Sequence, residues 1–178
     1  MGICISSSKK DTPELTLSYT QENINVRVDG DEVDDHKDLT KLDPNKISYF
    51  SFKGRTFYAK PSNIYDGDTF SICWIWKGEP IKYRCRCLGY DSPEMKPSLS
   101  NPNRDKEKEL AKAAKARFEQ LVSSGTDRLV KVECGEFDKY GRILVTVWVD
   151  TQTKSINQIM LDEGHGKAYT GGTKESWT

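Results

Sequence analysis

Histidines, paired cysteines and long apolar runs are scarce in this sequence of 178 residues. The two histidines, His36 and His165, lack the spacing of zinc ligands, and the five cysteines include no C-x-x-C pair. We therefore expect reduced thiols and no structural zinc site. The longest apolar run, at 143–149, is too short to cross a bilayer, and no apolar signal segment follows the start. We expect a chain that is not secreted and lies on the cytoplasmic side.

Phosphate-binding glycine motifs and internal repeats are absent as well. Neither G-x-G-x-x-G nor G-x-x-x-x-G-K-[ST] occurs, and the acidic stretch 29–38 lacks the register of an EF-hand loop. The formal net charge is zero, but residues 1–46 hold six basic and ten acidic residues, whereas residues 47–178 hold 21 and 17. A mildly basic body fits a nucleic-acid-handling domain, although such an imbalance is common on ordinary surfaces.

The first residues match a lipidation pattern. Gly2 followed by Ser6 fits M-G-x-x-x-[ST], which is typical of N-myristoylation, and Cys4 offers a place for a second acyl chain. Two chains make membrane binding lasting, whereas one is reversible. The alternative is a plain unstructured start, because the pattern is short. We expect residues 1–46 to form a flexible extension, with an acylated anchor and an acidic linker, and residues 47–178 to form the folded domain, a monomer.

Alternating apolar residues predict strands through most of the second part. Residues 47–52 and 56–60 are predicted to form one hairpin, and further strand patterns cover 69–76, 81–90, 128–137 and 142–149. Helical patterns cover 105–122 and a short stretch from Ser155 to Gly164. Together these elements predict a mainly β fold with α: a five-stranded OB-type Greek-key barrel with two covering helices.

The longer predicted helix is amphipathic. Its buried face is expected to hold apolar residues at helical spacing, and its charged residues are expected to form a solvated face. The apolar residues are Leu110, Ala113, Ala114, Phe118 and Leu121.

Four carboxylates and two arginines lie within or beside the strand patterns, an unusual set for a core. They are Asp66, Asp68, Arg86, Asp91, Glu94 and Arg142. Carboxylate oxygens suit a hard cation such as Ca²⁺, and arginine forks pair with the oxygens of a phosphodiester. A further carboxylate can orient or deprotonate a water. Gly67, in the tight D-G-D turn, is expected to adopt an unusual backbone dihedral.

Three motifs in these stretches resemble the staphylococcal nuclease (thermonuclease) family. They are Y-D-G-D-T at 65–69, R-x-x-x-x-D-S-P-E at 86–94 and D-K-Y-G-R at 138–142, in the family's order. The resemblance covers about 60% of the chain, from about residue 60 to residue 169. It implies a Ca²⁺-dependent phosphodiesterase that acts on single-stranded DNA and RNA, endo- and exonucleolytically, and leaves 3′-phosphates.

The resemblance also implies a role for each matching residue. The implied metal ligands are the carboxylates of Asp68 and Asp91 and the backbone carbonyl of Ser92. Asp66 is implied to be an acid near the metal that does not bind it directly. Those implied for the reaction are Glu94, which would position or activate the attacking water, and Arg86 and Arg142, which would bind the phosphate. Those implied to lie beside the substrate are Lys139, Tyr140 and Tyr169, the last loosely aligned.

The sequence departs from the family at its two ends. Family members usually continue into a further C-terminal helix, and here Trp177 is expected to plug the barrel end instead. Two alternatives stay open: a catalytically silent barrel that binds nucleic acid or protein, and a lipid-tethered scaffold whose barrel is secondary. A decayed site should have lost a carboxylate or an arginine, and none of the six is lost.

Overall fold

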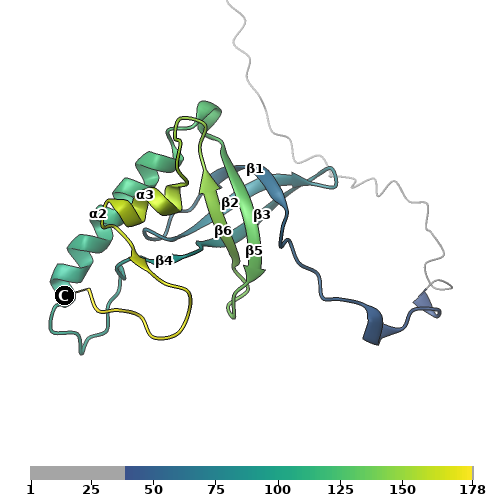
Figure 1. Cartoon of the computed structure of the whole chain (residues 1–178), viewed down its shortest axis with the longest axis horizontal. Helices are drawn as coiled ribbons and strands as arrows, with labels where there is room; N and C mark the ends of the chain where they lie inside the picture. The colour runs from purple at the N-terminus through teal and green to yellow at the C-terminus, as the bar shows by residue number, and fades with distance from the viewer. Residues whose placement is uncertain (1–38, 178) are drawn as a thin grey trace, which may run out of the picture. The chain divides into compact units, whose positions relative to one another are not determined.

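The computed structural model describes residues 39–177 (Figure 1). Five strands make up its main sheet: β1 (Thr56–Ser62), β2 (Thr69–Trp76), β3 (Glu79–Cys87), β5 (Val130–Phe137) and β6 (Ile143–Trp148). The helices are α2 (Arg104–Val122) and α3 (Ile156–Asp162), with short 3₁₀ turns at Pro44–Lys46 and Thr126–Arg128. Two short strands, β4 (Tyr90–Asp91) and β7 (Lys167–Ala168), form a separate ladder. In this part of the chain, no helix is long and apolar enough to cross a membrane.

The five strands close into a barrel in the order β1-β2-β3-β6-β5, with β5 pairing back onto β1. All neighbours are antiparallel except β3 and β6, which run parallel. This confirms the predicted OB-type barrel with two helices. Alternation explains the strands: in β6, Ile143, Val145 and Val147 point into the core and are completely buried, while the residues between them are partly exposed.

The hairpin predicted for residues 47–60 is wrong in its first half. Residues 47–52 form no strand, and Tyr49 is fully exposed. The physical reason is closure of the barrel: residues 56–59 of β1 pair with β5 and residues 60–62 pair with β2, so each part of β1 already has a partner strand. Phe52 instead packs into an aromatic cluster, edge-on to Phe57 and Trp74.

Helix α2 buries a face that is shifted from the predicted one. Leu110 and Ala113 are exposed, whereas Ala111 and Phe118 are fully buried, and Phe118 packs against Phe70 of the barrel. The buried side also includes Glu107, which is 6% exposed, so not all charged residues of the helix form a solvated face. Figure 1 shows α2 and α3 side by side at one end of the barrel.

The ladder of β4 and β7 connects the end of the barrel to the C-terminal residues. Tyr90 in β4 is completely buried, and its hydroxyl donates a hydrogen bond to the Gly67 carbonyl at 2.6 Å. Gly67 does not have the unusual dihedral that was predicted, since its φ is not positive. It is required for close packing, because a Cβ there would lie 2.9 Å from the Ala114 Cβ on α2. Trp177 is buried outside the barrel core, with the Lys167 ammonium over its ring, so it is not the plug that was predicted.

Candidate active site

Turns and strand ends from three parts of the chain enclose a cavity of about 740 Å³. The turn before β2 contributes Asp66, the end of β3 contributes Arg86, and the turn between β5 and β6 contributes Arg142. Glu94 and the residues after β7 complete the wall. The structure therefore brings the three predicted motifs to one place, although Thr69 of the first and Arg142 of the third are 73 residues apart in the sequence.

Asp66 shapes the turn that carries Asp68. One Asp66 oxygen, Oδ1, accepts hydrogen bonds from the backbone N–H groups of Asp68 (3.0 Å) and Thr69 (2.7 Å). A carboxylate that bonds its own backbone in this way fixes a tight turn. Asp66 is thus a buried acid behind the Asp68 carboxylate.

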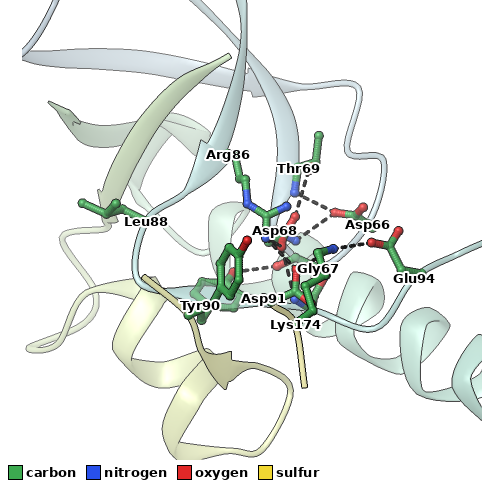
Figure 2. Close-up of polar contacts among 12 residues, drawn as sticks. Asp66, Gly67, Asp68, Thr69, Arg86, Leu88, Tyr90, Asp91, Glu94 and Lys174 are labelled. Carbon is green, nitrogen blue, oxygen red and sulfur yellow. Dashed lines mark hydrogen bonds and ion pairs between the residues drawn. The ribbon is translucent and has the colours of Figure 1, made fainter. Parts of the chain in front are cut away.

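Arg86 joins the two buried carboxylates at the centre of the site (Figure 2). Its Nη2 lies 2.8 Å from Asp68 Oδ2 and 2.6 Å from Asp91 Oδ1. The β2–β3 register dictates this contact, because Thr69 lies opposite Arg86 and places Asp68 at the end of that pair. The Ser92 backbone N–H donates to the same Asp68 oxygen, Oδ2, at 3.1 Å.

Asp68 is the most perturbed acid of the site. Burial, together with the charge of Asp66, raises its pKa from 3.8 to about 7, and the nearby Arg86 guanidinium only partly opposes this rise. Arg86 itself keeps its charge, because its carboxylate partners outweigh the lowering of its pKa by burial. The Asp68 carboxyl therefore titrates near neutral pH, and a cation bound beside it would favour the ionised form.

This raised pKa predicts a dependence of metal-free stability on pH. Asp68 binds its proton more tightly in the folded than in the unfolded chain, so its stabilisation is complete below about pH 4 and is lost as the pH rises through about 7. The loss amounts to at most about 4 kcal/mol. Urea unfolding in EGTA from pH 4 to pH 8 measures it, with Asp68→Asn as the control that should remove this slope. Equal slopes for both proteins would contradict the assignment.

Glu94 faces the cavity from the loop after β4, and two charged residues fix it. Its backbone N–H donates to Oε1 of the buried Glu107 at 3.1 Å, and its own carboxylate pairs with the Lys174 ammonium. Lys174 also lies 2.8 Å from Asp91 Oδ1. Burial lowers the pKa of Lys174, but its bonds to Asp91 and Glu94 outweigh this and raise it, so the ammonium is charged at neutral pH.

Arg142 lines the same cavity and follows directly after the β5–β6 turn. Asp138 holds it through a 2.6 Å bond to Nε, and Thr69 accepts a 3.2 Å bond from Nη1. The Tyr140 ring lies under both the Arg142 guanidinium (5.4 Å) and the Lys139 ammonium (5.1 Å). This arrangement keeps two cations and an aromatic face at the mouth of the site.

Tyr169 places its ring 5.7 Å from the Arg86 guanidinium carbon and lines the same cavity. Its hydroxyl donates to the Gly172 carbonyl at 3.1 Å, which folds the following turn back on itself. All residues implied for the reaction and the substrate thus border one space, whereas Gly2 and Cys4 lie outside the described residues.

The site holds oxygen donors of the kind that a hard cation takes. Asp68 and Asp91 each direct one carboxylate oxygen at the same nitrogen of Arg86, so oxygens from two motifs meet at one point. Within residues 39–177, no three His, Cys, Asp or Glu side chains gather into a metal cage. A Ca²⁺ ion held here would complete its shell with backbone carbonyls and waters, which Ca²⁺ readily accepts.

Two functional contacts escaped the sequence-based interpretation. Glu107 lies on the buried stripe of α2, four residues before Ala111, and this periodicity could have singled it out. Lys174 follows a Gly-Gly turn in the C-terminal residues, and no local pattern marks it. Both contacts depend on the fold, since Lys174 and Glu94 are 80 residues apart.

The barrel and its acidic, arginine-lined cavity define the class: an OB-type domain whose cavity is bordered by residues of all three motifs. Residues 84–176, about half of the chain, match the family described as "Staphylococcal nuclease homologue". This chain belongs to the staphylococcal nuclease family. The matched range includes Arg86, Asp91, Glu94 and Arg142 and begins after Asp68.

A curated relative supports the same assignment. The chain is 35% identical over 99 residues to a protein named "Endonuclease YncB" from Bacillus subtilis (strain 168). The match covers 56% of this chain and 42% of the relative, so this chain spans less than half of that protein's length.

Proposed function

We propose that this protein is a Ca²⁺-dependent nuclease that hydrolyses phosphodiester bonds in single-stranded DNA and RNA and leaves 3′-phosphates. The observation that carries the proposal is the convergence of Asp68, Asp91 and Glu94 with Arg86 and Arg142 around one cavity. Membership of the nuclease family and the name of the relative support the choice of substrate.

Each residue of the site has a distinct role in the proposed reaction. Asp68 and Asp91 would hold Ca²⁺, which when bound supplies positive charge to a phosphoryl oxygen. Glu94, with its carboxylate partly exposed at the cavity, orients a water and accepts its proton. Arg86 and Arg142 donate hydrogen bonds to the phosphate oxygens as their charge increases. Asp138 and Thr69 keep Arg142 in place, so the guanidinium needs little reorganisation.

The products test this function. A 5′-labelled single-stranded DNA and an RNA of the same sequence are incubated with the full chain and Ca²⁺, and the fragments are treated with a 3′-phosphatase. We expect cleavage of both, and a mobility shift after phosphatase treatment that reveals 3′-phosphate ends. Tight binding of either strand without cleavage would support the silent binding module instead.

We further propose that the chain is tethered to membranes through acylation of Gly2 and Cys4. Gly2→Ala removes the glycine that the myristoylation pattern requires, and we expect the variant to move from the membrane fraction to the soluble fraction of expressing cells. Cys4→Ser should leave a weaker, reversible association, because one acyl chain alone binds only marginally. An unchanged distribution of Gly2→Ala would disprove the tether while leaving the nuclease proposal intact.

A further inference from the structure

Residues 169–177, called the C-terminal strap below, carry a cation into the candidate site. Lys174 extends from the strap to Asp91 Oδ1 at 2.8 Å and to the Glu94 carboxylate (Figure 2). These are a carboxylate proposed to hold the metal and the carboxylate proposed to orient water. Within residues 39–177, Lys174 is therefore the one side chain that contacts both of these carboxylates.

The strap is anchored on both sides of Lys174. Before it, Tyr169 bonds the Gly172 carbonyl, and its backbone N–H bonds the Gly89 carbonyl at 2.9 Å. After it, Lys167 of β7 donates to the Ser176 carbonyl at 2.6 Å and lies over the buried Trp177 ring. The two anchors hold the strap against the site, so the position of Lys174 is built into the fold and does not depend on one exposed ion pair.

The two carboxylates proposed to hold the metal are buried beneath Lys174 and Arg86. Asp68 and Asp91 are 2% and 4% exposed, whereas Arg86 and Lys174 line the cavity above them. A divalent cation that enters from the cavity meets these two positive groups before it reaches the buried oxygens. Arg86 and Lys174 share Asp91 Oδ1, but Arg86 contacts Asp68 as well, whereas Lys174 contacts Glu94, so Lys174 is the cation placed between Asp91 and Glu94.

We propose that Lys174 is an affinity-setting residue of the site: its ammonium occupies a coordination position between Asp91 and Glu94, and a divalent cation binds only by displacing it. The inference rests on the proposed metal-dependent function. Displacement breaks two ion pairs with carboxylates, which weakens the binding of the metal. It also frees the Glu94 carboxylate to bind a water, so Glu94 can orient that water only when the metal is present.

Calorimetric titration of Ca²⁺ into the metal-free full chain tests this. We expect Lys174→Met to bind Ca²⁺ about tenfold more tightly than the wild type. The wild type must break two modest ion pairs of Lys174 when Ca²⁺ binds, and the variant has no such pairs to break. Lys139→Met is the charge-matched control, because Lys139 lines the same cavity but lies over Tyr140. It should change the affinity by no more than about twofold. Lys174→Arg should keep the wild-type affinity, because it retains a cation between Asp91 and Glu94.

The outcomes separate the inference from the function on which it rests. An unchanged affinity of Lys174→Met, or an equal gain in both methionine variants, would overturn the role of Lys174 while Ca²⁺-dependent cleavage persisted. Absence of Ca²⁺ binding and of cleavage in the wild type would overturn the metal-dependent function itself. A second readout is acetylation of lysine amines followed by mass spectrometry, in which Ca²⁺ should increase the labelling of Lys174 and leave that of Lys154 unchanged.

Discussion

Glu94→Gln is expected to lower the rate of phosphodiester cleavage by about 10²- to 10⁴-fold, the range for loss of a general base. The amide keeps the size of the side chain but cannot accept a proton from water. Asp68 and Asp91 remain, so Ca²⁺ binding should persist. Single-turnover cleavage of single-stranded DNA measures the rate, and calorimetry measures the affinity for Ca²⁺.

A matched substitution on α2 controls for the loss of one negative charge. Glu109→Gln removes a carboxylate that forms an exposed ion pair with Lys112, outside the cavity, and should leave the rate unchanged. If Glu94→Gln cleaved at the wild-type rate, Glu94 would have no part in the chemistry. If it lost Ca²⁺ binding as well, Glu94 would be a metal ligand.

Arg86→Ala is expected to affect both stability and catalysis. Asp68 and Asp91 are buried on either side of the guanidinium, and removing it leaves their charges without this partner. Breaking a buried ion pair in this way costs about 3–5 kcal/mol. The loss of one donor to the developing phosphate charge should lower the rate by about 10²- to 10³-fold. Urea unfolding and single-turnover cleavage measure the two effects.

Two variants of the same strand separate these effects. Arg84→Ala removes an exposed arginine two residues earlier in β3 and should leave the free energy of unfolding nearly unchanged. Arg86→Lys keeps a cation between the carboxylates, so we expect it to recover most of the stability. It lacks the planar fork that meets two phosphate oxygens, so its rate should stay low. Full activity of Arg86→Lys would contradict a bidentate role.

Much of the fold could be predicted because its signals are local. The hairpin of β2 and β3 and that of β5 and β6 alternate apolar and polar residues around glycine-containing turns, and Ser155 caps α3 by accepting from the Gln158 N–H. Residues 47–52 alternate in the same way, yet form no strand. Closure of the barrel is a property of the whole sheet, and in it β1 pairs with β5 and β2 instead of with them.

The residues of the candidate site could be predicted from the sequence, but the contacts that link them to distant segments could not. The motifs placed Arg86 opposite the Asp68 turn, because neighbouring antiparallel strands fix that register. The buried Glu107 behind Glu94, and Lys174 between Glu94 and Asp91, arise where segments distant in sequence pack together. The local sequence around an acidic residue in a helix, or around a single lysine, is the same whether the side chain is exposed to solvent or bonds a distant segment.

The most direct measurement is the hydrolysis of a single-stranded DNA oligonucleotide with Ca²⁺ and with EGTA, by the wild type and by Asp68→Ala. Thermal unfolding of both proteins confirms that each is folded under the assay conditions. A Ca²⁺-dependent nuclease at this site cleaves only when Ca²⁺ and Asp68 are both present. Cleavage that persists in EGTA or in Asp68→Ala, or tight DNA binding with no cleavage, would contradict it.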